Sequence, residues 1–350
     1  MRRLVVTFVR IGDIAMLLPL LRHLARGSEL HVLARPWAKD LLSGQAWIAG
    51  IHGCATPHKG GSWFGDLLWG GERRRLLAEH GGRYDEIIRM ARESPAMLRW
   101  VRQARGDAVE RTIDISLRGP RQAVDQVGDA LAVAGIGLDG FDPVPRLDVP
   151  EADLAAARAD LAALGRRVVL VQTGSSLTDR RWRPRPNLKG LTDAQWAGWF
   201  AQLFAENSCD AIALVGSRNE TAPAQAVIAA CPAALRPRLH LRLDWNLRTL
   251  AARFAAAHGA ISVDTGPGHL AAAVGCPLVA VFGPTDPKLY LPRGPGRVEL
   301  MLGSASCQFC HGTSRWDSCR DNICLNRLAT EALMAAWRRL AGPVGGTQRA

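Results

Sequence analysis

The feature that most constrains the fold is a repeated pattern in which a short apolar run leads into a glycine-containing loop and then into a helical pattern. Residues 4–9 form such a run, Gly12 and Asp13 follow it, and Ile14, Leu17, Leu21 and the leucines around them recur at helical spacing. A strand, a tight loop and a helix in this order are the opening of a βαβ unit. The segment therefore predicts a parallel α/β sheet.

The same pattern continues through both halves of the chain. In the first half, we expect strands at 30–33, 86–88 and 112–115, a helix that starts at Pro36, and a helix at 122–134. In the second half, we expect strands at 168–172, 211–215, 259–263 and 278–282 and helices at 151–164, 249–257, 268–274 and 331–340. Strands and helices that alternate in both halves predict an α/β protein with two doubly wound, Rossmann-like domains facing a cleft.

The length of 350 residues also suits two domains. Residues 140–150 contain three prolines and two aspartates with little periodicity, which is typical of a linker or domain edge. We expect an N-terminal domain at 1–155, a C-terminal domain at 156–330, and a last segment, 331–350, whose helix returns towards the first domain.

The chain is basic, with 44 Lys and Arg against 32 Asp and Glu and a formal net charge of +12. Only four of the cations are lysine, and arginine binds phosphate and carboxylate groups bidentately, which suits an anionic partner. An Arg- and Ala-rich composition that reflects genomic base bias explains the same excess, so charge alone names no partner.

Composition and patterning exclude other classes. With 48% apolar and 22% charged residues, intrinsic disorder is excluded. The apolar run near the N-terminus is interrupted by Arg10 and Asp13, which argues against a signal peptide, and no stretch of 18 apolar residues predicts a membrane span. We expect a cytoplasmic protein.

Polar residues gather after the strand expected at 259–263, where Asp264, Thr265, Gly266 and His269 fall within six residues. In open α/β sheets, ligands bind beyond the carboxyl ends of strands, where the next helix offers N–H groups and a partial positive charge. Asp264 is a candidate to bind sugar hydroxyls, and the other three are candidates to hold a phosphate. The alternative is that Asp264 and Thr265 only cap the helix, but capping does not explain the glycines and the histidine.

A loop of small residues follows the strand expected at 168–172, and it contains Ser175 and Ser176 and then Arg180 and Arg181. Hydroxyl groups and backbone N–H groups in such a loop can cradle a diphosphate, and an arginine can neutralise a leaving phosphate. A solvated surface loop in an Arg-rich protein is the equally supported alternative.

Two further acids follow expected strands. Glu220 lies in the polar loop after 211–215, where it either reads a ribose or adenine edge or favours a helix dipole as a first-turn acid. Asp13 lies in the loop after the first strand, where it acts either as a general base towards a hydroxyl nucleophile or as a helix cap.

Four of the eight cysteines are close together in the sequence, with the spacing C-x2-C-x8-C-x4-C: Cys307, Cys310, Cys319 and Cys324. This spacing indicates a closed, structural thiolate site for Zn or Fe. Two disulfides or four free thiols remain as alternatives. His311 follows Cys310 and is a possible replacement ligand.

Taken together, five segments resemble glycosyltransferase family 9, the ADP-heptose:lipopolysaccharide heptosyltransferases. They are VRIGDIAMLLPLLRHL (9–24), QTGSSLTDRRWRP (172–184), LVGSRNE (214–220), the DTGPGHLAA-containing segment 247–287, and CQFCHGTSRWDSCRDNICL (307–325). Arg180 stands where the family usually carries a lysine before the tryptophan of the second segment, and QTG replaces a common Pro-Gly pair.

The resemblance implies a GT-B fold and an inverting transfer of heptose from ADP-heptose, or a similar nucleotide sugar, to the anionic inner core of lipopolysaccharide. It implies a single displacement with no cofactor for catalysis, and contact with the inner face of the inner membrane is compatible with it. The roles that it implies are Asp13 and Arg180 in catalysis, Ser175, Ser176 and Arg180 at the diphosphate, Glu220 at the nucleoside, and Asp264, Thr265, Gly266 and His269 at the heptose and phosphates.

Three rival functions differ from this one. Some relatives glycosylate autotransporter proteins and carry a cysteine-bound iron, so the acceptor stays open. A metal-stabilised nucleic-acid-binding protein would need basic and aromatic residues around the cysteines, and only Arg315, Arg320, Phe309 and Trp316 lie between them, so we expect no nucleic acid partner. The presence of Asp13 argues against an inactive sugar-binding relative.

Overall fold

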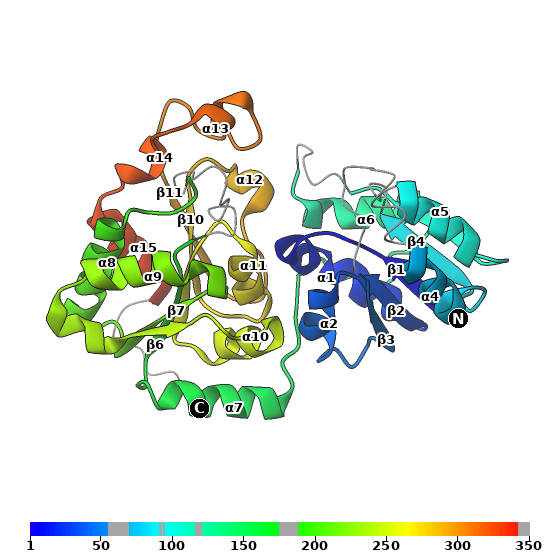
Figure 1. Ribbon diagram of the computed structural model, residues 1–350, viewed down its shortest axis with the longest axis horizontal. Coiled ribbons are helices and arrows are strands. Elements are labelled where there is room, and N and C mark those ends of the chain that lie inside the picture. The colour runs from blue at the N-terminus through cyan, green and yellow to red at the C-terminus, as the bar shows by residue number, and fades with distance from the viewer. Residues whose placement is uncertain (55–69, 91–92, 94, 116–120, 175–187, 342–350) are drawn as a thin grey trace. The chain divides into compact units, whose positions relative to one another are not determined.

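The computed structural model describes residues 1–54, 70–90, 93, 95–115, 121–174 and 188–341, and it divides the chain into two compact units, Met1–Asp148 and Val149–Ala350 (Figure 1). The division falls in the irregular segment 140–150. The boundary expected at residue 155 falls inside α7 (Glu151–Ala162), which packs against α10 (Leu247–Ala256) of the second unit.

The first unit contains a sheet of five strands in the order β3-β2-β1-β4-β5, and every pair of neighbours is parallel. The strands are β1 (Arg2–Val6), β2 (Glu29–Ala34), β3 (Gly50–Gly53), β4 (Glu86–Met90) and β5 (Val109–Ile113). At the centre, Val5 lies opposite Val32 and Ile88, and all three are buried. The strand order reverses between β1 and β4.

Helices α1 (Ile11–Ala25), α2 (Pro36–Leu42), α4 (Gly70–His80) and α5 (Pro95–Ala104) lie between successive strands of this sheet, and α6 (Ala123–Val133) follows its last strand, β5. Helices α4 and α5 pack together over a buried cluster that includes Leu4, Leu33 and Trp100, and α1 packs against α6 and β2. Burial of side chains of this size contributes roughly 1.5–3 kcal/mol each and holds the helices on the sheet.

The second unit contains a six-stranded, fully parallel sheet in the order β11-β10-β9-β6-β7-β8. The strands are β6 (Val168–Gln172), β7 (Ala211–Val215), β8 (Leu239–Arg242), β9 (Gly259–Val263), β10 (Leu278–Phe282) and β11 (Val298–Leu302). Here the order reverses between β6 and β9, which is the Rossmann arrangement. Strands β6, β7, β9 and β10 have the bounds that the sequence predicted.

Helices cover both faces of this sheet (Figure 1). They are α7, α8 (Asp193–Ala205), α9 (Thr221–Ala230), α10, α11 (Gly266–Ala273), α12 (Pro287–Tyr290), α13 (Ser314–Ser318), α14 (Ile323–Asn326) and α15 (Thr330–Ala341), with 3₁₀ turns η2 (Arg218–Glu220) and η3 (Ala233–Arg238). Helices α8, α9 and α15 share a buried cluster that includes Trp199 and Trp337, whereas α10 and α11 lie on the opposite face, with α11 against β9 and β10.

The last helix packs on its own unit, because α15 contacts β10, β11 and α8. Its expected return towards the first unit remains a prediction. None of the helices in the described ranges is both long enough and apolar enough to cross a membrane.

Candidate functional site

Polar side chains gather at the carboxyl ends of the strands on both sides of the point where the order of the second sheet reverses. Asp264 directly follows β9, Gln172 ends β6 next to it, and Glu220 follows β7. A crevice outside the carboxyl ends of strands at such a point is where open α/β sheets bind ligands. The polar residues form two groups, one around Asp264 and one around Glu220.

The first group is built on a buried ion pair. Lys189 Nζ lies 2.5 Å from Asp264 Oδ2 and 3.4 Å from the Asp264 carbonyl oxygen, and the two side chains are only 12% and 9% exposed. Burial alone would raise the pKa of Asp264, but the charge of Lys189 and the hydrogen bond that it donates outweigh burial and lower that pKa. The site therefore holds an ammonium and a carboxylate in contact, away from bulk water.

His269 is the third member of this group and is 5% exposed. The pKa of His269 is lowered to about 4, because burial, helped by the charge of Lys189, outweighs the opposing effect of the Asp264 carboxylate. The imidazole is therefore neutral at physiological pH, and Lys189 supplies the positive charge of the group.

Thr265 and Gly266 connect β9 to α11. Thr265 occupies the N-cap position, but its hydroxyl donates to the Val263 carbonyl oxygen at 3.2 Å rather than capping the helix, and Gly266 is the first helical residue. A Cβ at Gly268 would lie 3.0 Å from Ser262 Oγ, so this glycine permits close packing of the helix on its strand. The structure thus brings Asp264, Thr265, Gly266 and His269 together at one strand end.

Glu220 is the centre of the second group. Its Oε2 accepts hydrogen bonds from the Ser217 N–H at 2.7 Å and from Ser217 Oγ at 2.9 Å, and its Oε1 accepts from Gln172 Nε2 at 2.9 Å. A Cβ at Gly174 or Gly216 would lie 3.1 or 2.8 Å from one of these oxygens, so two glycines make room for the carboxylate. Glu220 therefore joins the loops after β6 and β7, and it forms a capping box with Ser217 in the first turn of η2.

Ser175, Ser176 and Arg180 lie outside the described residues. The segment that holds them starts after Gly174, next to Glu220, and ends before Leu188 and Lys189. Both polar groups of the site therefore lie at the ends of this segment.

Asp13 lies at the corresponding place in the first unit, after β1 and next to the point where strand order reverses. Helix α1 begins at Ile11, so Asp13 belongs to its first turn rather than to a loop, and its Oδ2 accepts from the Arg10 N–H at 3.0 Å. Glu93 follows β4 and accepts from the Phe8 N–H at 3.3 Å, which adds a second carboxylate at this point. Both functions considered for Asp13, cap and base, are compatible with this position.

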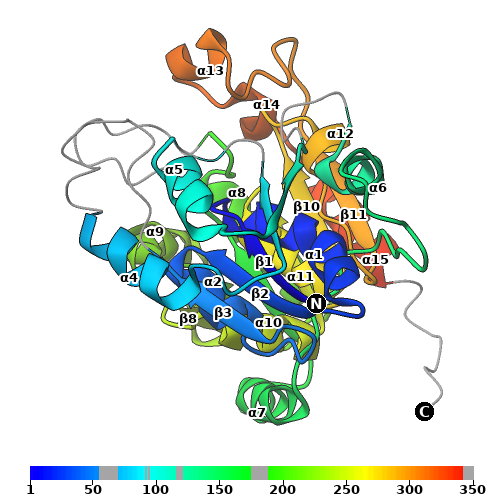
Figure 2. The same cartoon turned by 90° about the vertical axis from the view of Figure 1, so that its right-hand side faces the viewer.

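The four clustered cysteines lie around α13 and α14, which are adjacent in Figure 2. All eight cysteines belong to the described part of the chain and are free thiols. Burial and the neighbouring charges of Cys307 and Cys319 raise the pKa of Cys310, and burial together with the other three thiols raises that of Cys324 to about 11.

The cluster is not arranged as a closed metal site. Cys324 Sγ donates to Asn322 Oδ1 at 2.9 Å and Cys319 Sγ to the Asp321 carbonyl oxygen at 3.2 Å, so both thiols face protein acceptors. Among the residues that the structure describes, no three His, Cys, Asp or Glu side chains converge in a way that would hold a metal ion. The expected Zn or Fe therefore stays a prediction.

Sequence reasoning missed Lys189 at the strand ends of the second unit and Glu93 beside Asp13 in the first unit. Lys189 lies in an irregular stretch with no motif around it, and its partner is 75 residues away. Its rarity was the one available signal, because the chain has four lysines in all.

Comparison with known proteins agrees with the resemblance seen in the motifs. The model of glycosyltransferase family 9 (heptosyltransferase) matches residues 102–316, which is more than half of the chain. Lipopolysaccharide heptosyltransferase 1 of Pseudomonas aeruginosa is 42% identical over 72 residues, which cover 21% of this chain and 18% of that protein. That alignment thus spans less than a fifth of the curated relative.

Solved structures extend the likeness to nearly the whole chain. The E. coli ADP-heptose LPS heptosyltransferase II has a TM-score of 0.74 at 18% identity, with 97% of this chain and 98% of that one covered. The E. coli heptosyltransferase WaaC with ADP-2-deoxy-2-fluoro heptose has a TM-score of 0.66 at 17% identity, with 97% and 99% covered. The two parallel sheets therefore form the GT-B fold expected from the sequence, and together with the family match they place the chain in glycosyltransferase family 9, the heptosyltransferases.

Proposed function

We propose that this protein transfers heptose from ADP-heptose to the inner core of lipopolysaccharide, with inversion at the anomeric carbon. The observation that carries the donor half of the proposal is the buried Lys189–Asp264 pair at the switch point of the second sheet. A lysine there offers a point charge to phosphate oxygens, and a carboxylate accepts hydrogen bonds from sugar hydroxyls. The names of the similar proteins above support the choice of ADP-heptose.

The transfer is a single displacement. The acceptor hydroxyl oxygen attacks the anomeric carbon of the donor, and the bond between that carbon and the phosphate oxygen breaks. The acceptor proton passes to the carboxylate of Asp13, which acts as general base. The electron pair of the broken bond leaves with ADP, and Lys189 stabilises the charge that develops on the diphosphate. We propose the same role for Arg180, and phosphate contacts for Ser175 and Ser176.

We propose that the remaining motif residues surround the donor. Thr265, the Gly266 N–H and His269 hold the heptose and phosphates, and the neutral His269 imidazole both donates and accepts hydrogen bonds. The stretch around Glu220 holds the nucleoside. Glu220 itself acts there by fixing the loops after β6 and β7, because its two oxygens already accept three hydrogen bonds.

A donor screen tests the proposal. ADP-heptose, UDP-sugars and GDP-sugars are offered with truncated lipopolysaccharide acceptors, and product is measured by mass spectrometry. Transfer from ADP-heptose alone supports the proposal, and transfer only from another nucleotide sugar contradicts it.

The acceptor needs its own test, because a protein acceptor remains the alternative. An autotransporter passenger domain is offered in parallel with lipopolysaccharide that lacks heptose. Heptose on the protein and none on the lipid would move the function to the alternative. We propose that the reaction with the lipid acceptor takes place at the inner face of the inner membrane.

The four-cysteine cluster is tested by elemental analysis of protein purified without added metal. We expect about one Zn or Fe per chain, as for a four-thiolate site. Because Cys319 and Cys324 donate to protein acceptors, binding would have to replace both hydrogen bonds. A folded, metal-free protein would contradict the expectation.

A further inference from the structure

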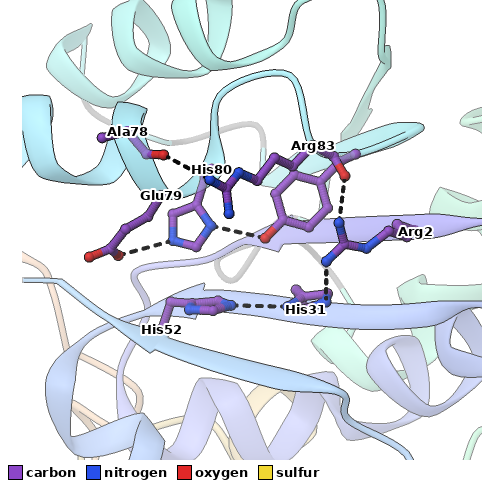
Figure 3. A pocket seen from close by; sticks show the side chains of 8 residues that line it. Arg2, His31, His52, Ala78, Glu79, His80 and Arg83 are labelled. Atoms are coloured by element: carbon purple, nitrogen blue, oxygen red, sulfur yellow. Dashed lines mark hydrogen bonds and ion pairs between the residues drawn. The ribbon is translucent and has the colours of Figure 1, made fainter.

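A pocket of about 530 Å³ lies in the first unit, beside the first residue of β1 and under the end of α4 (Figure 3). Asp13 and Glu93 follow the other ends of β1 and β4, so this pocket is separate from the site described above. Its lining carries the basic, imidazole and phenol side chains of Arg2, His31, His52, His80, Arg83 and Tyr84, and one carboxylate, that of Glu79.

Two of the histidines lie on adjacent strands and form a fixed pair. His31 Nδ1 lies 3.0 Å from His52 Nε2, and His31 Nε2 lies 3.0 Å from Glu29 Oε1. Since a carboxylate only accepts, His31 donates from Nε2, and its Nδ1 accepts the proton of His52 Nε2. A Cβ at Gly50 would clash with His31 Nδ1, so the absence of a side chain at position 50 leaves room for this pair.

The third histidine has an unused nitrogen. His80 is 3% exposed, and its Nδ1 lies 2.9 Å from Tyr84 Oη, but its Nε2 has no hydrogen-bond partner among the residues that the structure describes. The nearest carboxylate oxygen, Glu79 Oε2, is 3.7 Å away, and both oxygens of Glu79 accept from Arg75 at 2.7 and 2.9 Å. A buried polar nitrogen without a partner costs about 1–3 kcal/mol, which a ligand acceptor would recover.

The same pocket contains a guanidinium, that of Arg83, with no counter-ion in the part of the chain that the structure describes. Arg83 forms no salt bridge within the described ranges; its guanidinium donates to the Ala78 carbonyl oxygen at 3.4 Å, and its own carbonyl oxygen accepts from Arg2 Nη1 at 3.1 Å. Its charge nevertheless reaches His80, where burial is the main cause of a lowered pKa and Arg83 lowers it further. In contrast, the Arg2 Nε lies 3.2 Å from Glu29 Oε2, and Arg2 stacks over Tyr84 at 5.5 Å.

We propose that this pocket binds the phosphate group of a small molecule, with Arg83 and His80 as its principal donors. A guanidinium fork and an imidazole N–H from different elements match an anion with several acceptor oxygens. Arg2 adds positive charge on the β1 side of the pocket, where Figure 3 shows it beside His31. The rings of His52 and Tyr84 also line the pocket. Free phosphate and phosphate monoesters share this chemistry.

The test uses the full chain with isotope-labelled histidine, whose nine side chains are assigned from single His→Gln variants. Inorganic phosphate and glycerol phosphate are titrated separately, and side-chain shifts are followed by NMR. We expect the signals of His31, His52 and His80 to move together. Tighter binding of the ester indicates a phosphorylated small molecule, and equal binding indicates free phosphate; either result supports the pocket.

Matched variants on and after α4 make the test specific. Arg83→Gln is expected to weaken phosphate binding by at least about tenfold, which is the loss of one charge-assisted hydrogen bond. Arg74→Gln removes the same charge from an exposed position on α4 that does not line the pocket, and it should leave binding unchanged. Both positions are exposed, so neither variant is expected to affect folding.

His269 reports separately on the site of the second unit. Phosphate that moves only the His269 signal would overturn the inference, as would equal affinities in Arg83→Gln and Arg74→Gln. Neither result depends on whether the protein transfers heptose.

Discussion

Lys189 and Asp264 form a buried ion pair at the carboxyl end of β9, with Nζ 2.5 Å from Oδ2. Removal of one partner from such a pair leaves the other charge buried and uncompensated, at a cost of about 3–5 kcal/mol. A diphosphate bound next to the pair would bring further negative charge to Lys189. If the donor binds there as proposed, the pair contributes both to the stability of the second unit and to donor binding, and the two effects can be separated.

Lys189→Met is expected to weaken ADP binding by about tenfold to a hundredfold, because a charge-assisted hydrogen bond contributes about 1.5–3 kcal/mol. Calorimetric titration with ADP measures this loss. Lys288→Met is the control, because it removes a lysine that follows the N-cap of α12. The ADP affinity of this variant should equal that of the unaltered protein.

The double variant Lys189→Met/Asp264→Asn separates binding from folding. Removal of the second charge should restore most of the unfolding free energy lost in Lys189→Met, since no unpaired carboxylate remains. ADP affinity should stay low. Recovery of both quantities together would mean that Lys189 acts only through stability.

Asp13→Asn is expected to abolish transfer while ADP affinity and folding are retained. The amide oxygen of asparagine can still accept from the Arg10 N–H, so the first turn of α1 keeps its hydrogen bond, but an amide cannot take up the acceptor proton. Steady-state turnover and ADP titration check the two halves. Turnover near that of the unaltered enzyme would leave Asp13 with the cap alone.

Glu220→Gln is expected to lower the unfolding free energy by about 1–3 kcal/mol, because the new NH2 group would face donors on Ser217 or Gln172. Urea unfolding measures the change. The opposite pattern, with stability unchanged and only adenosine or ADP affinity reduced, would assign Glu220 to the nucleoside instead.

The central strands and the Asp264 segment were predictable because their signals are local. Strands β6, β7, β9 and β10 are continuous apolar runs buried on both faces, and such runs are bounded sharply by loops. Edge strand β3 (Gly50–Gly53) was missed because its four residues, GIHG, carry no such run.

Contacts between distant residues were not predictable. Lys189 follows β6 in the chain, and it meets Asp264 because β6 and β9 are neighbours in the sheet. The end of β6 at Gln172 and the start of β9 at Gly259 are separated by 86 residues, and neither periodicity nor spacing in the sequence predicts that these strands pair. The three pocket histidines likewise lie on β2, β3 and α4, and no short-range motif connects them. Local patterns thus predict strands and loops, whereas tertiary pairing decides which side chains meet.

The buried histidines predict how stability depends on pH. Burial lowers the pKa of His52 to about 4, with further contributions from the charges of His80 and His31, and burial also lowers that of His80. In the unfolded chain these groups titrate near pH 6.5, so the unfolded state binds more protons between pH 6.5 and 4. The contribution of these neutral imidazoles to the unfolding free energy is therefore complete above about pH 6.5, and it is lost as the pH falls towards 4.

We expect the unfolding free energy to fall between pH 7.5 and 5, by up to about 2 kcal/mol for a shift of the size found for His52. Urea unfolding in phosphate-free buffer measures this fall in the unfolding free energy. Most carboxyl groups stay ionised between pH 7.5 and 5, so their titration contributes little to it. His52→Gln should flatten the slope because glutamine does not titrate. An unchanged slope in that variant would show that His52 is accessible to protons in the folded protein. Between pH 7.5 and 8.5, the titration of these histidines should leave the unfolding free energy unchanged, both in the unaltered protein and in the variant.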